Sequence, residues 1–192
     1  MIIAFDLMDT LLRDPYREAH EKAFSISFDE FARRRPEGLY HALERGELTE
    51  EAYWSALRDA GLTFDVEVFH RTRKEHYAWL NGMRELVTEC GRAHRIVVAS
   101  NYPVWLEEIG TDLLGGTGLE IYGSYRFGAR KPSERFFRLL CEETDVALRD
   151  LVLIDDVRAN TDAVAALGGI GIPFASAHAA RQQLCRHGLL TG

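Results

Sequence analysis

The sequence predicts an α/β fold in which a parallel sheet is flanked by helices and carries an inserted, all-helical segment. Three short, nearly continuous apolar runs are rich in β-branched residues, as strands covered on both faces are. Helical patterns, with apolar residues at three- and four-residue spacings, alternate with these runs. Such alternation indicates right-handed βαβ units. One long stretch near the N-terminus breaks the alternation, because it contains helical patterns and no convincing strand.

The expected strands are the apolar runs themselves. The three clear ones cover residues 1–5, 95–99 and 151–154, and two weaker candidates cover residues 119–124 and 169–173. The clear runs show little alternation of polar and apolar positions, which is typical of buried parallel strands.

The helices expected between the strands have recognisable ends. Their patterns cover residues 82–92, 104–114, 133–143 and 159–167. Ser133, which follows Lys131-Pro132, is a suitable N-cap for the third of them. Gly168 is a suitable stop after the fourth.

The stretch that breaks the alternation is predicted to be a helical cap. Its helical patterns cover residues 17–34, 50–60 and 65–79, and Ser27 with Glu30 predicts a capping box if the first of them breaks in two. A helical block inserted after the first strand would cover the strand ends as a lid. The expected division is a core of residues 1–13 and 81–192 and a cap of residues 14–80.

Bulk properties exclude several classes of function. The 192 residues suffice for one well-buried core, and the net charge of -7 without a strong basic stripe disfavours nucleic acid as a partner. The three cysteines are widely spaced and lack a CxxC pair, which favours reduced thiols. The apolar N-terminal run is too short for a signal peptide or a membrane span. We therefore expect a cytoplasmic protein with no membrane partner, while the oligomeric state is not predicted.

Polar residues follow the predicted strands at the edge where an open parallel sheet has its ligand crevice. Asp6 follows the first strand, and a carboxylate there suits a nucleophile or a metal ligand, or else the cap of a turn. Ser100 and Asn101 follow the next clear strand, where they can hold a phosphoryl or carboxylate oxygen or form an ordinary turn.

Two further clusters complete the candidate site. Lys131 is one of only three lysines among 23 basic residues, and its ammonium suits charge neutralisation on a transferring group, although an exposed loop lysine is the commoner case. Asp155 and Asp156 follow a strongly apolar strand, where adjacent carboxylates repel each other unless a cation compensates. Mg²⁺ is the cation that best suits such oxygen ligands.

In this order and spacing, the four clusters resemble the motifs of the haloacid dehalogenase-like (HAD) hydrolase superfamily. Residues 6–11 resemble the first motif, Ser100 the second, Lys131 the third, and Asp155 with Asp156 the fourth. The helical insertion falls where capped members of the superfamily carry their cap. The resemblance spans essentially the whole chain.

The resemblance implies a Rossmann-like core and a Mg²⁺-dependent phosphatase that acts on a small phosphorylated metabolite. Asp6 would attack phosphorus to give an aspartyl-phosphate, which water then hydrolyses. The Mg²⁺ ligands would be the Asp6 carboxylate, the Met8 backbone carbonyl and the Asp156 carboxylate, with Asp155 as a further ligand or a supporting group.

The resemblance also implies how the substrate is held. Ser100 and Lys131 would bind the phosphoryl oxygens. Asn160 would orient one of these two side chains. The remaining candidates for substrate binding are Thr10, Asn101 and Arg13.

One position departs from the family pattern. Most phosphatases of the superfamily have a second Asp two residues after the nucleophile, which serves as general acid and base, and this chain has Met8 there. A thioether cannot exchange a proton, and the lost assistance is typically worth about 100- to 10,000-fold in rate. Asp9 stands where the family usually has Gly and would substitute if the loop rotates, although a shift of one residue normally points a side chain elsewhere.

Met8 leaves other functions open. The chain could be a weakly active or inactive member that serves as a binding or regulatory protein. A dehalogenase also lacks the second Asp, but it needs no metal and lacks the acidic pair of the fourth motif. A phosphonatase would need a cap lysine, and Lys22 and Lys74 are more simply surface residues.

Overall fold

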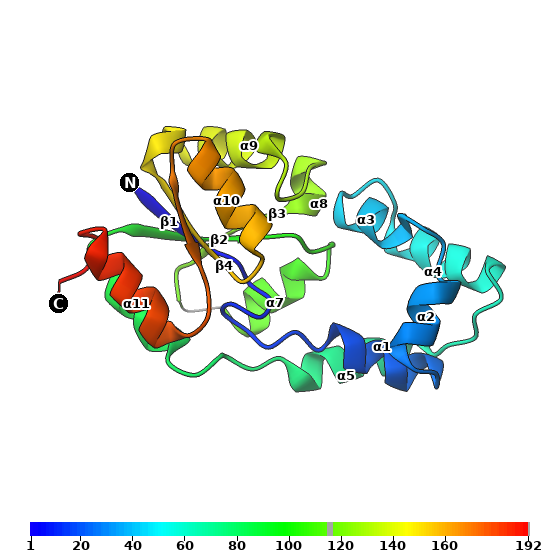
Figure 1. The fold of residues 1–192 in the computed structure, drawn as a ribbon. Helices are drawn as coiled ribbons and strands as arrows, with labels where there is room; N and C mark the ends of the chain where they lie inside the picture. Colours follow the sequence, from blue (N-terminus) through cyan, green and yellow to red (C-terminus); the bar gives the residue numbers. More distant parts are fainter. Residues whose placement is uncertain (115–116, 192) are drawn as a thin grey trace.

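The computed structural model describes residues 1–114 and 117–191, and it confirms the α/β class with a five-stranded parallel sheet in the order β3-β2-β1-β4-β5 (Figure 1). The strands are β1 (Ile2–Phe5), β2 (Arg95–Ser100), β3 (Glu120–Gly123), β4 (Leu151–Asp155) and β5 (Ile170–Pro173). In the central strand, Phe5 is in register with Val98 of β2 and Ile154 of β4. The carboxyl ends of these three strands therefore meet at one edge of the sheet.

Helices cover both faces of the sheet. Ile2 and Ala4 pack in one hydrophobic cluster, and Ile3 and Phe5 pack in another, as the alternation of side chains along a strand requires. The first cluster includes residues of α9 (Glu134–Thr144) and α10 (Arg158–Ala166), and the second includes residues of α6 (Met83–Cys90), α7 (Leu106–Asp112) and α11 (Ala177–Arg186). Figure 1 shows these two layers on opposite sides of the sheet.

Four elements were not expected from the sequence. They are α3 (Leu39–Glu44), α8 (Ser124–Phe127), the 3₁₀ turn η1 (Leu148–Asp150) and α11. The apolar stripe of α11 is narrow, since only Ala180 and Leu184 of that helix are buried, so its periodicity is weak. Ser133 occupies the N-cap position of α9 as predicted, but its side chain makes no capping hydrogen bond. Among the described residues, no helix combines the length and the apolarity needed to cross a membrane.

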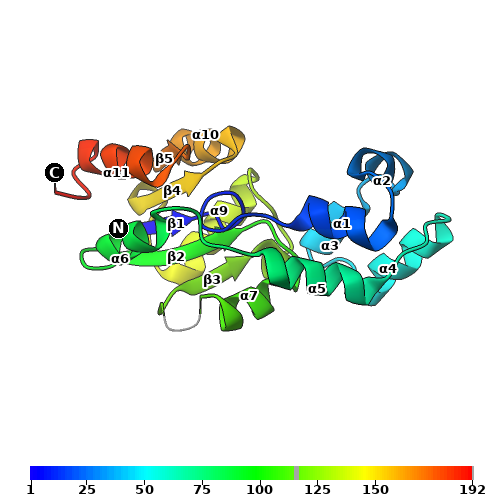
Figure 2. The same ribbon diagram turned by 90° about the horizontal axis from the view of Figure 1, so that it is seen from below.

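A group of five helices lies between β1 and α6 in the chain. They are α1 (Tyr16–Phe24), α2 (Phe28–Arg34), α3 (Leu39–Glu44), α4 (Glu50–Asp59) and α5 (Val66–His76). The stretch predicted as residues 17–34 does break in two, and Ser27 Oγ accepts a hydrogen bond from the backbone N–H of Glu30 at 3.2 Å. The five helices lie together beyond the carboxyl edge of the sheet (Figures 1 and 2).

Two linkers join the helical group to the sheet, and they pair with each other. The backbone N–H of Arg13 donates to the carbonyl of Ala78 at 2.8 Å, and that of Leu80 donates to the carbonyl of Leu11 at 2.9 Å. This pairing holds the outgoing and returning chains side by side, so the residues just after β1 are fixed at the boundary of the two parts.

Candidate active site

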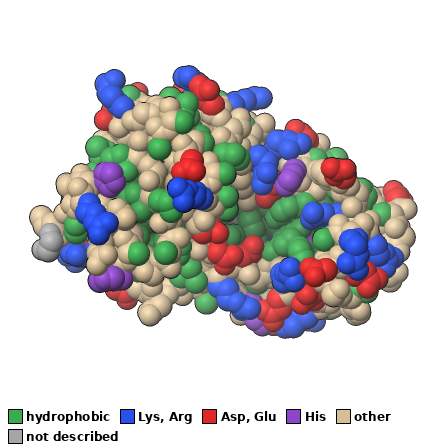
Figure 3. All heavy atoms as spheres, viewed as in Figure 1, with side chains coloured by type: hydrophobic (Ala, Val, Ile, Leu, Met, Phe, Trp, Pro, Cys, Tyr) green, Lys and Arg blue, Asp and Glu red, His purple; other side chains and the backbone are tan. Residues whose placement is uncertain are grey.

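A cavity of about 210 Å³ lies at the carboxyl edge of the sheet. Most of the residues predicted from the sequence line it: Asp6, Met8, Asp9, Ser100, Asn101, Lys131, Asp156 and Asn160. Figure 3 shows acidic side chains gathered at the hollow between the sheet and the helical group. Residues far apart in the sequence therefore share one cavity.

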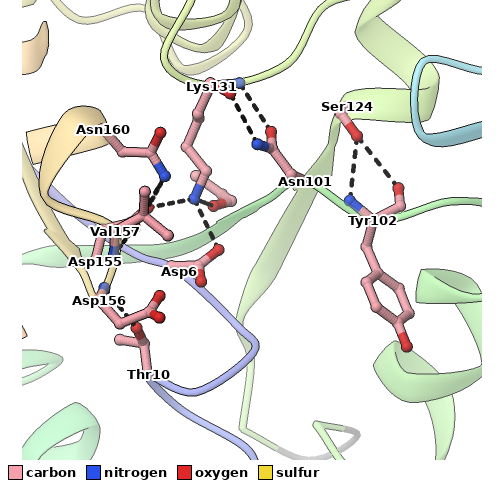
Figure 4. Close-up of polar contacts among 11 residues, drawn as sticks. Asp6, Thr10, Asn101, Tyr102, Ser124, Lys131, Asp155, Asp156, Val157 and Asn160 are labelled. Atoms are coloured by element: carbon pink, nitrogen blue, oxygen red, sulfur yellow. Dashed lines mark hydrogen bonds and ion pairs between the residues drawn. The ribbon is translucent and has the colours of Figure 1, made fainter. Parts of the chain in front are cut away.

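The ammonium of Lys131 is the centre of this arrangement (Figure 4). Its Nζ donates to Asp6 Oδ1 at 2.7 Å, to Asp155 Oδ2 at 2.6 Å and to the carbonyl of Ala99 at 2.6 Å. These three acceptors come from the ends of β1, β4 and β2. Since Lys131 is only 1% exposed, it is not an ordinary loop lysine on the surface.

Burial and neighbouring charges shift the pKa values of this group. The pKa of Asp6 is raised to about 7, mainly by burial; the charge of Lys131 opposes this rise, and the charge of Asp155 adds to it. Burial acts to lower the pKa of Lys131, but the carboxylates of Asp6 and Asp155 together raise it above its usual range. Lys131 therefore stays charged at neutral pH.

Asp155 is fully buried, and neighbouring donors hold both of its carboxylate oxygens. Asn160 Nδ2 donates to Oδ1 at 2.9 Å and to Oδ2 at 3.0 Å, and the backbone N–H of Val157 donates to Oδ1 at 2.9 Å. Asn160 thus contacts Asp155, which in turn contacts Lys131. The structure places Asn160 behind the acidic group and not against Ser100.

Asp156 lies at the open side of the acidic group. Its backbone N–H donates to Thr10 Oγ1 at 3.2 Å, and partial desolvation together with Asp155 raises the pKa of its carboxyl. Carboxylate oxygens of Asp6, Asp155 and Asp156 lie within 4.8 Å of one another. Three carboxylates around one ammonium have an excess of negative charge, and oxygen is the ligand atom that Mg²⁺ prefers. The residues present therefore fit a divalent cation.

Asn101 and Ser100 lie at the end of β2. The Asn101 amide donates to the carbonyl of Lys131 at 2.9 Å and accepts from the Lys131 N–H at 2.8 Å. Both ends of this amide therefore hold the loop that carries Lys131. Ser100 is 1% exposed and lines the cavity.

The remaining candidates lie along the loop after β1. Met8 and Asp9 line the cavity, and Asp9 has a left-handed backbone with φ of 55°. Thr10 is buried, where it receives the N–H of Asp156. Arg13 is not among the residues that line the cavity, and it pairs with Glu18 at 2.8 Å.

Three residues that line the cavity were not predicted from the sequence: Val157 and the two charged residues Asp14 and Arg130. Asp14 lines the cavity, and burial raises its pKa to about 6. Arg130 lines it too and pairs with Glu44 of α3 at 3.0 Å, a carboxyl whose pKa burial raises to about 7. In the sequence, Asp14 was recognised only as the first residue of the predicted cap. The pair of Arg130 with Glu44 depends on the packing of α3, and no local sequence pattern indicates that packing.

Comparison with known proteins agrees with the motifs. No protein-family model matches the chain. Flavin mononucleotide hydrolase 1 of Arabidopsis thaliana, a chloroplast protein, is 27% identical over 194 residues, which cover 98% of this chain and 78% of the relative.

Solved structures share the fold at low sequence identity. The HAD family enzyme BT-2542 of Bacteroides thetaiotaomicron, in complex with magnesium and inorganic phosphate, has a TM-score of 0.74 at 15% identity and covers 91% of this chain and 94% of its own. A HAD-like hydrolase of Porphyromonas gingivalis has a TM-score of 0.77 at 19% identity, covering 96% and 97%. The L-2-haloacid dehalogenase of Xanthobacter autotrophicus, with chloropropionic acid covalently bound, has a TM-score of 0.65 at 14% identity, covering 96% and 82%. The chain therefore has the fold of haloacid dehalogenase-like (HAD) enzymes, and over nearly its whole length it is similar in sequence to the Arabidopsis hydrolase.

Proposed function

We propose that this hydrolase is a Mg²⁺-dependent phosphatase that acts on a small phosphorylated metabolite. The observation that carries the proposal is the acidic group of Asp6, Asp155 and Asp156, whose oxygens lie within 4.8 Å of one another beside the buried Lys131. A cation held by such a group favours a phosphate ester, because a phosphoryl group brings further negative charge that a carbon–halogen bond does not.

In this proposal the carboxylates of Asp6 and Asp156 and the backbone carbonyl of Met8 would hold Mg²⁺. Asp155 would support them from behind, since its oxygens are already engaged by Lys131 and Asn160. The bound cation would supply charge neutralisation on the phosphoryl oxygens.

The side chains of the chain would then carry the reaction. Asp6 attacks phosphorus, the bond from phosphorus to the leaving oxygen breaks, and a phosphoryl group is left on Asp6. Lys131 and the Ser100 hydroxyl bind the phosphoryl oxygens during this transfer. In the second step water attacks phosphorus, the bond to Asp6 breaks, and inorganic phosphate is released with the Asp6 carboxylate regenerated.

We also propose that residues 14–80 act as a mobile cap on a core of residues 1–13 and 81–192. Two polar contacts support closure of α3 over the site: Ser124 Oγ donates to the Glu44 carbonyl at 2.5 Å, and Arg130 pairs with the Glu44 carboxylate. Opening would break both contacts and admit substrate, and closure would exclude water.

The Arabidopsis relative makes flavin mononucleotide the first substrate to test. That relative is a chloroplast protein, and the cytoplasmic location expected for this chain stays a prediction. Two alternatives from the sequence also need testing. The chain could be a dehalogenase, because structural neighbours include such enzymes. It could also be a binding protein with little activity, because Met8 replaces the usual acid and base.

The experiment measures phosphate release from flavin mononucleotide and from 4-nitrophenyl phosphate, with Mg²⁺ or with a chelator. We expect turnover that needs both Mg²⁺ and Asp6, so that Asp6→Asn is inactive. Asp162→Asn is the matched control, because Asp162 is an exposed residue of α10 that does not line the cavity. Release of chloride from 2-chloropropionate would favour the dehalogenase, and the absence of Asp6-dependent turnover on a broad panel of phosphate esters would favour the binding protein.

A further inference from the structure

The reaction proposed above needs a proton for the leaving group, and Met8 cannot supply it. An alcohol leaves as a strongly basic alkoxide unless a nearby acid protonates it. Among the described cavity residues, the carboxyl groups outside the acidic group of Asp6, Asp155 and Asp156 are those of Asp9 and Asp14.

The backbone holds Asp14 firmly in the cavity wall. Its own N–H donates to Asp9 Oδ1 at 3.1 Å, and its Oδ1 accepts from the N–H of Tyr16 at 2.9 Å. The adjacent Arg13 is fixed by its backbone bond to Ala78 of the returning linker. Asp14 lines the cavity, and among the described residues no hydrogen-bond donor engages its Oδ2.

The surroundings of Asp14 suit a group that gives and takes a proton near neutral pH. Burial raises its pKa to about 6, the carboxylates of Asp9 and Asp156 act in the same direction, and the Tyr16 N–H and Arg73 act against it. The other titratable neighbours are the hydroxyls of Tyr40, Tyr77 and Tyr102. A pKa close to the working pH is what general acid-base catalysis requires.

Asp9 is less suited to this role. Its side chain is exposed, and its Oδ1 holds the backbone N–H of Asp14. Asp9 also has a left-handed backbone, with φ of 55°. Asp9 is therefore placed as the support of Asp14.

We propose that Asp14 is the general acid and base of this hydrolase and takes the role that Met8 cannot fill. This inference rests on the phosphatase function proposed above. In the first step Asp6 attacks phosphorus, the bond from phosphorus to the leaving oxygen breaks, and the Asp14 carboxyl gives its proton to that oxygen. In the second step the Asp14 carboxylate takes a proton from the attacking water as the bond from phosphorus to Asp6 breaks. Both groups return to their starting states.

The test compares Asp14→Asn with wild type on a series of phosphate esters whose leaving groups range from acetyl phosphate through 4-nitrophenyl phosphate to an alkyl phosphate. Asn keeps the oxygen that accepts from Tyr16 N–H and replaces the other carboxyl oxygen with an amide nitrogen, which is not an acid near neutral pH. We expect kcat/KM to fall about 100-fold or more on the alkyl ester and to stay near wild type on acetyl phosphate, because a good leaving group needs no acid. Asp14→Ser, which also keeps an acceptor for Tyr16 N–H, is expected to give the same pattern and serves if the Asn variant does not fold.

Asp9→Asn is the matched comparison, since it keeps the acceptor for the Asp14 N–H. The inference would be overturned if kcat/KM of Asp14→Asn fell equally on every ester or did not fall at all. It would also be overturned if a loss that depends on the leaving group appeared in Asp9→Asn and not in Asp14→Asn. These outcomes presuppose wild-type turnover that depends on Asp6. If the wild type showed no turnover that depends on Asp6, the proposed phosphatase function itself would fail. Failure of that function is therefore distinguishable from failure of the role proposed for Asp14.

Discussion

The ammonium of Lys131 lies 2.7 Å from the carboxylate of Asp6, although the two residues are 125 positions apart in the sequence. The same ammonium reaches Asp155 at 2.6 Å. The buried ammonium of Lys131 therefore links the loop before α9 to the ends of the neighbouring strands β1 and β4. We therefore expect its removal to affect both the stability of the fold and the proposed reaction.

Lys131→Met tests the structural part of this relationship. The substitution leaves the buried carboxylates of Asp6 and Asp155 without their cation, so we expect a loss of about 3–5 kcal/mol in the free energy of unfolding, measured in urea without Mg²⁺. Lys22→Met is the control, because Lys22 is about half exposed and its pair with Glu18 is worth about 1 kcal/mol or less. Equal stability of the two variants would contradict this account.

Asn101→Ala tests how Lys131 is positioned. The substitution removes the two hydrogen bonds that hold the backbone of Lys131, and we expect a cost of about 1–3 kcal/mol in stability. Because the ammonium is then less well placed, kcat on 4-nitrophenyl phosphate should fall as well. A variant with wild-type kcat would show that the loop needs no such support.

Gly171→Ala tests the packing of α10 on β5. A Cβ at Gly171 would lie 2.1 Å from the backbone oxygen of Thr161, which cannot move without shifting the helix, so we expect a loss of about 3 kcal/mol in stability. Gly110→Ala is the matched control, because there the close atom is the flexible end of the Ile121 side chain and alanine favours the helix. Thermal unfolding should separate the two variants clearly, and similar melting temperatures would contradict the packing argument.

We expect acid to destabilise the group of five helices, because it contains the buried His20. Burial among aromatic rings lowers the pKa of His20 from 6.5 to about 3, so the folded state holds it neutral while the unfolded state takes up a proton. Stability is therefore fully present above pH 6.5 and falls as the pH decreases toward 3, by about 2 kcal/mol at pH 5. Urea unfolding of His20→Phe between pH 7 and pH 5 should lack this contribution. Parallel losses in wild type and variant would contradict it.

The three central strands β1, β2 and β4 could be predicted because each is a buried apolar run whose pattern is local. The edge strands β3 and β5 are only partly buried, so their sequence patterns are weaker. Asp6, Lys131 and Asp156 could be placed together because parallel strands end at one edge. The contacts of Asn101 and Asp14 could not be predicted, since each is made across a loop: Asn101 with the Lys131 backbone, and Asp14 with Asp9 and Tyr16.

The missed helices have a related cause. Only Leu43 and Glu44 of α3 are buried, and α11 has a narrow apolar stripe, so neither has a strong periodic signal. Both helices are positioned by tertiary contacts, α3 through Ser124 and Arg130 and α11 through the pair of Arg181 with Glu89.

The most direct test of the central claim is to trap the phosphorylated protein. A radiolabelled phosphate ester is mixed with the protein and Mg²⁺ for a single turnover, the reaction is stopped with acid, and the labelled peptide is identified. The account predicts label on Asp6 in the wild type and no label and no turnover in Asp6→Asn. Turnover by Asp6→Asn at the wild-type rate, with no label on the peptide that contains residue 6, would contradict it.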